Sequence, residues 1–111
     1  MKVYDALNQL AQELKESEEY VNYKMAKQTI ALKSELKKQI DDFSQEKQLL
    51  QIEELQTGKR NEEKENQLKN NYEKILKYPE AEKYFEAESK FNLLLADVNR
   101  IIGEAIKDVL Q

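Results

Sequence analysis

Adjacent pairs of carboxylates are the residues of this sequence that most resemble a catalytic or metal-binding arrangement. They can act as general acid and base or hold a metal ion, but neighbours on a helix point ~100° apart and do not converge on one ligand. The sequence also has no His and no Cys, so the usual general base, a thiolate and the commonest transition-metal ligands are absent. We therefore expect no enzyme, no cofactor and no metal site, and interpret as solvated helix surface the pairs Glu18-Glu19, Asp41-Asp42, Glu53-Glu54 and Glu62-Glu63.

One further carboxylate, Glu88, interrupts an apolar helical stripe between Tyr84 and Phe91. In that position it needs a basic partner, a tyrosine hydroxyl or water. Either a local tilt of the helix exposes it, or it fixes the register of helix pairing, as polar residues in helix seams do. The chain has six tyrosines, which suit half-buried sites at the edge of a core or in a contact with another protein.

Two short basic pairs offer a different chemistry, the binding of phosphates. An RNA-binding accessory protein that uses Lys37, Lys38, Lys59 and Arg60 is accordingly the alternative function. A nucleic-acid binder usually presents a broad basic face, whereas this chain intermixes 18 basic with 22 acidic residues for a formal charge of −4. Nucleic acid is therefore the less favoured partner.

Composition limits the fold that must position these residues. The 111 residues include only two Gly and one Pro, and no run of alternating β-branched residues predicts a strand. Charged residues at 36% and aromatic residues at 8% predict a thin core under a broad solvated surface. No apolar run approaches the ~20 residues of a membrane span, and no signal-peptide core is evident. We expect one all-α domain over residues 1–111, in the cytoplasm and without a membrane partner.

Local signals divide the chain into about five helices, at residues 3–16, 18–32, 34–56, 62–78 and 79–111. Ser17, Ser34 and Asn61 are the expected N-cap residues. Gly58 is expected to close the third helix in the left-handed conformation, and Pro79 suits the first turn of the last helix. The helices should form an antiparallel hairpin or bundle, with the first two packed across one end or reaching a partner chain.

The segment from Pro79 to Gln111 reads as one unbroken helix, which at about thirty residues would be ~45 Å long. Its apolar stripe steps alternately by three and four residues and is interrupted by Glu88. It consists of Ala81, Tyr84, Phe91, Leu95, Val98, Ile102, Ala105 and Val109. So small a chain has little other material to cover it, so we expect a second copy, as a homodimer or homotetramer, or another protein to contribute. The expected association residues are Tyr84, Glu88, Phe91, Leu95, Val98 and Ile102.

Two alternatives remain open in this segment from sequence alone. The seam could close within the chain, between copies, or on a different protein. Gly103, inside the helix, costs roughly 1 kcal/mol relative to Ala; it is either simply tolerated or permits the close approach of another backbone.

Taken in order along the chain, several segments resemble the YlbF/YmcA family of small bacterial helical proteins, most closely its short YheA-type members. The resemblance covers nearly the whole chain and implies a cytoplasmic, self-associating all-α fold with a non-enzymatic adaptor or regulatory role. It rests on Val3-Tyr4-Asp5-Ala6, Ser17-Glu18-Glu19-Tyr20 with Tyr23, Phe43, Gly58-Lys59, Tyr84-Phe85-Glu86-Ala87-Glu88, Leu93-Leu94 and Ile101-Ile102.

The resemblance also implies partners. Better-understood members are accessory factors that modulate the endoribonuclease RNase Y, with effects on RNA processing, competence, biofilm formation and sporulation. RNase Y or a family paralogue is therefore a candidate partner. Some members bind iron–sulfur clusters through cysteines, and this chain has none, so no cluster is carried over. The family often has Asp-Pro where this chain has Lys33-Ser34. This difference affects only the start of the helix predicted at residues 34–56.

Overall fold

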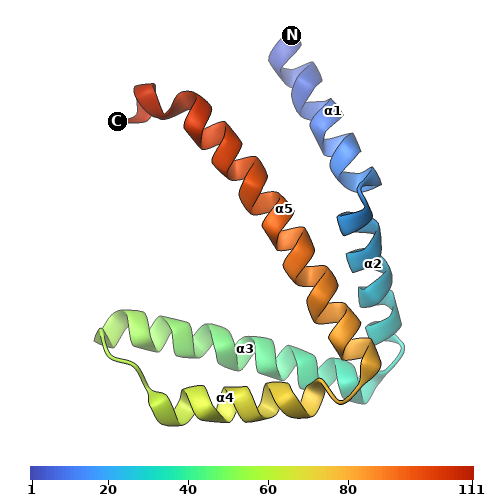
Figure 1. Cartoon of the computed structure of the whole chain (residues 1–111), viewed down its shortest axis with the longest axis vertical. Coiled ribbons are helices and arrows are strands. Elements are labelled where there is room, and N and C mark those ends of the chain that lie inside the picture. The colour runs from blue at the N-terminus through green and yellow to red at the C-terminus, as the bar shows by residue number, and fades with distance from the viewer. The chain divides into compact units, whose positions relative to one another are not determined.

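The computed structural model describes residues Met1–Gln111 as five α-helices with no strand (Figure 1). The all-α class, the five helices and the long C-terminal helix are thereby confirmed. The helices are α1 (Lys2–Glu16), α2 (Glu18–Ala31), α3 (Ser34–Thr57), α4 (Glu62–Ile75) and α5 (Pro79–Leu110). They belong to two compact units, one of residues 1–27 with 84–111 and the other of residues 28–83.

Ser17 separates α1 from α2, as its position before two acidic residues predicts. Its hydroxyl donates to the Leu14 carbonyl oxygen at 2.7 Å and accepts from the Tyr20 backbone N–H at 3.2 Å. The Ser17 backbone is extended, with φ −67° and ψ 150°. One side chain thus gives the Leu14 carbonyl at the end of α1 a second donor, besides the Ser17 backbone N–H, and satisfies an N–H left free at the start of α2.

The loop between α3 and α4 also forms as predicted. Gly58 has φ +71° and its N–H donates to the Glu54 carbonyl oxygen at 2.9 Å, which closes α3 in the left-handed conformation. Asn61 is the N-cap of α4, since its Oδ1 accepts from the Lys64 N–H at 3.1 Å.

The predicted cap at Ser34 is wrong by one residue. Lys33 is the N-cap of α3, without a side-chain hydrogen bond, and Ser34 is the first helical residue. The reason lies in the backbone: the Lys33 N–H donates to Ile30 at 2.9 Å and its carbonyl accepts from Lys37 at 2.8 Å. This turn carries the chain from α2 into α3 without help from the serine hydroxyl.

In the unit of residues 28–83, α3 and α4 pack as an antiparallel hairpin. The rings of Phe43 and Tyr72 lie 5.5 Å apart, and the Asn71 amide donates to Glu46 at 3.3 Å. Partners thus run in opposite directions along the two helices. This unit contains nearly all of the buried apolar residues: Ile30, Leu36, Ile40, Leu50, Ile75 and Ala81.

The unit of residues 1–27 and 84–111 contains α1, most of α2 and most of α5. Phe85 is its one buried apolar residue, and α1 has none. In Figure 1, α5 starts beside one end of α2 and separates from the arm formed by α2 and α1 towards the two chain termini. This unit therefore pairs its helices at one end and leaves apolar side chains accessible at the other. None of the five helices combines the length and the apolar character needed to cross a bilayer.

Candidate association site

The apolar stripe that begins at Ala81 and ends at Val109 lies along α5 and is called the α5 seam. Its first half packs against α2 through a cluster of aromatic rings around Glu88. Tyr84, Glu88 and Phe91 follow one another at helical spacing, so they share one face of α5. The hydroxyls of Tyr23 and Tyr84 both donate to Oε2 of Glu88, at 3.1 Å and 3.2 Å. The carboxylate therefore finds tyrosine partners, one from its own helix and one from α2.

The rings complete this cluster. Tyr23 lies 5.7 Å from Tyr84 and 5.6 Å from Phe91 between ring centroids, and Tyr20 meets Phe91 edge-on at 6.0 Å. Such tilted and edge-to-face pairs are favourable by about 0.5–1.5 kcal/mol beyond their burial. Because Tyr20 and Tyr23 are three residues apart, both point from the same face of α2.

Burial raises the pKa of the Tyr84 hydroxyl well above its ordinary value of 10.0, and the nearby Tyr23 hydroxyl and Glu88 carboxylate add to this effect. Burial is also the main reason that the pKa of Tyr23 is raised, with Glu88 again contributing in the same direction. A negative charge on either tyrosine would face the carboxylate in a partly desolvated site. Both hydroxyls are therefore held protonated as hydrogen-bond donors.

Beyond Phe91 the side chains of the seam become progressively more exposed to solvent. Leu95 and Val98 are half-buried, Ile102 is 49% exposed and Val109 is 82% exposed. The predicted association residues thus fall into two groups. Tyr84, Glu88 and Phe91 contact α2 of the same chain, whereas Leu95, Val98 and Ile102 continue the stripe towards solvent.

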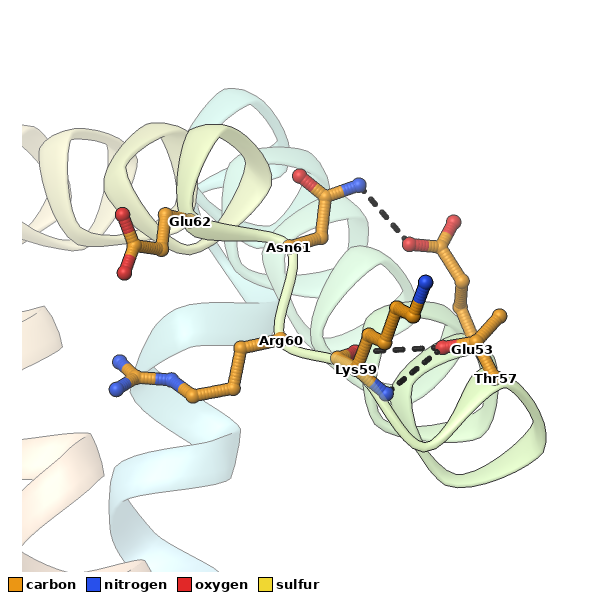
Figure 2. Close-up of a pocket in the computed structure, with 6 residues that line it drawn as sticks. All are labelled: Glu53, Thr57, Lys59, Arg60, Asn61 and Glu62. Carbon is orange, nitrogen blue, oxygen red and sulfur yellow. Dashed lines mark hydrogen bonds between the residues drawn. The ribbon is translucent and has the colours of Figure 1, made fainter.

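The second candidate surface, the α3–α4 loop, is an open hollow lined by charged and polar side chains (Figure 2). Lys59 and Arg60 lie on it. The Arg60 guanidinium is already bound to Glu65, with Nη2 to Oε1 at 2.6 Å, and this hydrogen bond raises the pKa of Arg60. Its positive charge is therefore matched within the chain.

The other basic pair lies at the opposite end of α3. Lys37 donates to Asp41 at 2.6 Å, and ~30 Å of helix separates it from Lys59. Lys38 and Lys59 take part in none of the ion pairs of the chain. The fold therefore does not gather the four predicted RNA-contacting residues into one basic patch.

Two residues near the end of α3, which the sequence alone suggested were solvated helix surface, bind this loop. Glu54 accepts the Asn61 backbone N–H at 2.8 Å, and Glu53 accepts from Asn61 Nδ2 at 2.9 Å and from Lys64 Nζ at 2.7 Å. The hydrogen bonds from Lys64 and Asn61 lower the pKa of Glu53. Glu53 and Glu54 thus hold the loop in place. The only hint of this in the sequence is that they stand eight and seven residues before the capping Asn61. No group of three or more Asp or Glu side chains is arranged to hold a metal ion.

Comparison with known proteins gives the family of this chain. Residues 3–107 match the family model described as "Control of competence regulator ComK, YlbF/YmcA". The chain belongs to the YlbF/YmcA family. The resemblance read from the residues is thus confirmed, and the family's description links it to the regulation of competence.

Similar chains occur in several bacteria and match over nearly their full length. A UPF0342 protein of Desulfitobacterium hafniense is 37% identical over 99% of this chain and 89% of the relative. Those of Clostridium novyi and Symbiobacterium thermophilum are 33% and 35% identical, over 97% and 94% of this chain and 95% and 93% of the relatives. The chain is therefore similar in extent to these relatives.

Proposed function

We propose that this YlbF/YmcA-family protein is a non-enzymatic regulatory adaptor that self-associates through the outer half of the α5 seam. The proposal rests on the solvent exposure of one helical stripe. The stripe is covered by α2 at Tyr84 and is open to solvent at Ile102 and Val109. Open apolar stripes of this kind are typical of surfaces that bind another protein.

The chemistry of the titratable groups supports a role without catalysis. A nucleophile or general base needs a pKa brought towards neutrality, whereas those of Tyr23 and Tyr84 are shifted away from it. The chain also has no His or Cys to take that role. Glu88 serves instead to fix the register of α2 on α5, because a slide of one residue would break its hydrogen bond from Tyr23, which joins the two helices.

The partner of this adaptor follows from the family. Its members regulate competence by the family's description, and the accessory factors that this chain resembles modulate RNase Y in the cytoplasm. We accordingly take RNase Y or a family paralogue as the second partner, after a copy of the chain itself. The mixed charge of the surface, 18 basic and 22 acidic residues, fits a protein partner better than a nucleic acid.

The substitution Leu95→Asp tests the proposal. It places a charge in the middle of the outer seam and should convert the oligomer into a folded monomer, because an unpaired carboxylate buried between helices is strongly unfavourable. Light scattering after gel filtration gives the mass, and circular dichroism reports whether the helices persist.

Leu93→Asp is the matched control, since Leu93 is exposed and two residues of helix place it on nearly the opposite side from Leu95. It should leave the oligomer intact. An unchanged, folded oligomer in Leu95→Asp, or equal dissociation in both variants, would contradict the assignment of the outer α5 seam as the interface.

A further inference from the structure

The outer side of α3, turned away from α4, carries three exposed aliphatic side chains. Leu49, Ile52 and Leu55 are 59%, 52% and 85% exposed, and they follow one another at helical spacing. Leu50, which is buried in the α3–α4 hairpin, points roughly 160° away from Ile52. The three exposed residues, here called the α3 patch, are therefore covered neither by α4 nor by their own helix.

Glutamine side chains border the α3 patch. Each residue of the patch has a glutamine one turn before it, and a further glutamine stands one turn after Ile52. These are Gln45, Gln48, Gln51 and Gln56, all of them exposed. Residues one turn apart are neighbours on a helix surface, so amide groups surround the aliphatic side chains. An amide both donates and accepts hydrogen bonds and carries no charge.

The charged residues of this part of α3 lie away from the patch. Those between Gln45 and Gln56 are Glu46, Lys47, Glu53 and Glu54. Each lies at least ~100° around the helix from Ile52, and the three glutamates accept hydrogen bonds from α4 or its N-cap residue. The nearest charge before the patch on its own side is Asp41, two turns before Leu49, and Lys37 pairs with it at 2.6 Å. The α3 patch and its amide border are therefore electrically neutral.

We propose that the α3 patch binds one amphipathic helix of a different protein, whose aliphatic stripe is bordered by uncharged amide side chains. Such a helix matches the patch in both respects, because its stripe covers the aliphatic residues and its amides exchange hydrogen bonds with the glutamines without leaving a charge unpaired. The inference goes beyond the self-association proposed above. It gives the adaptor a second surface on another helix and does not depend on the oligomeric state.

The size of the α3 patch argues against a second copy of the chain as its occupant. An aliphatic side chain has on the order of 100 Å² of apolar area to bury, so the exposed parts of these three amount to about 200 Å². A stable dimer takes ~800 Å² from each partner. The patch therefore suits a transient contact with a single helix.

The neutrality of the α3 patch argues against two other kinds of occupant. Nucleic acids are held by Lys and Arg side chains on their phosphates. Anionic membranes are bound by amphipathic surfaces with basic flanks. The patch has amides where either ligand would require positive charge.

The test uses three synthetic helical peptides that share one aliphatic stripe and differ only in the residues bordering it, which are all Gln, all Glu or all Lys. Fluorescence anisotropy measures their binding to the full-length chain. We expect the Gln peptide to bind at least ~10-fold more tightly than the other two, because a charge desolvated against neutral amides is unfavourable. Its affinity should change little between about 0.05 M and 0.5 M salt, since no charges meet.

Variants of the full-length chain place the contact on α3. Ile52→Asp should weaken binding of the Gln peptide at least ~10-fold, as for loss of a central interface residue. Leu93→Asp is the matched control, since Leu93 is an exposed leucine of α5, and it should leave binding unchanged. Circular dichroism reports whether the helices persist. If Ile52→Asp loses helix content, Leu55→Asp, at a more exposed position, replaces it in the comparison.

Four results would overturn the inference: no binding of the Gln peptide, equal or tighter binding of a charged peptide, binding that survives these α3 substitutions, or a lower oligomer mass in Ile52→Asp. The last would mean that a second copy covers the α3 patch. The proposed function is tested separately by Leu95→Asp, which leaves the α3 patch intact. Either proposal can therefore fail while the other stands.

Discussion

The hydroxyls of Tyr23 and Tyr84 donate to the same oxygen of Glu88, so one carboxylate joins two helices. Position 88 was recognisable in the sequence as an anomaly, since a charged residue in an apolar seam must find a partner. The spacing of Tyr20 and Tyr23 placed both on one face of α2. The hydrogen bond from Tyr23 to Glu88 could not be predicted. These residues are 65 positions apart in the sequence, and their contact depends on the register between α2 and α5.

At this residue scale we predict a loss of stability in alkaline solution. The pKa values of Tyr23 and Tyr84 are raised above 10.0 in the folded chain, so the unfolded chain releases these protons first as pH rises. The associated stability is fully present below about pH 10 and is lost as pH rises above it.

Urea unfolding of wild type and of a Tyr23→Phe/Tyr84→Phe variant, at neutral and alkaline pH, measures this effect. The variant should be less stable at neutral pH by about 1–2 kcal/mol, through its lost hydrogen bonds, and should lose less stability above pH 10. Parallel losses in the two proteins would contradict the explanation.

The helices themselves follow from local signals at their ends. Ser17, Gly58 and Asn61 each act where the sequence predicts, because capping depends on neighbours within one turn. The exception at Ser34 arises where backbone hydrogen bonds of a tight turn make a side-chain cap unnecessary. The bracing of the loop by Glu53 and Glu54 escaped prediction for a related reason, since it requires the folded hairpin.

The two glycines of the chain allow a matched pair of Gly→Ala substitutions, one at a helix end and one in a helix interior. Gly58→Ala should lower the free energy of unfolding by about 1–2 kcal/mol, because φ +71° is unfavourable for any residue with a Cβ. Gly103→Ala should instead raise it by about 0.5–1 kcal/mol, since the helix gains a better helix former and a Cβ there meets nothing within 4 Å in the single chain.

Thermal or urea unfolding at one fixed protein concentration compares these variants, because the stability of an oligomer depends on concentration. A destabilised Gly103→Ala that also associates more weakly would mean that another backbone approaches α5 at this glycine. That result would decide between the two roles that the sequence leaves open for it.

For the whole molecule, the decisive feature is the uneven distribution of its core. The α3–α4 unit buries most of the large apolar residues, whereas the α1–α2–α5 unit pairs its helices around Glu88 and leaves its outer stripes open. The sequence predicted an all-α fold and an excess of uncovered apolar seam from helix periodicity alone. It could not predict where along α5 the cover by α2 ends, because that depends on tertiary packing. The single-domain organisation remains a prediction.

The solution mass of the wild-type chain decides whether the protein self-associates. It is measured by light scattering after gel filtration across a range of concentrations. We predict a mass that is an integral multiple of the 13.1 kDa chain, at least twofold, and that falls towards one chain only on strong dilution. A single-chain mass at every concentration would contradict self-association through the α5 seam.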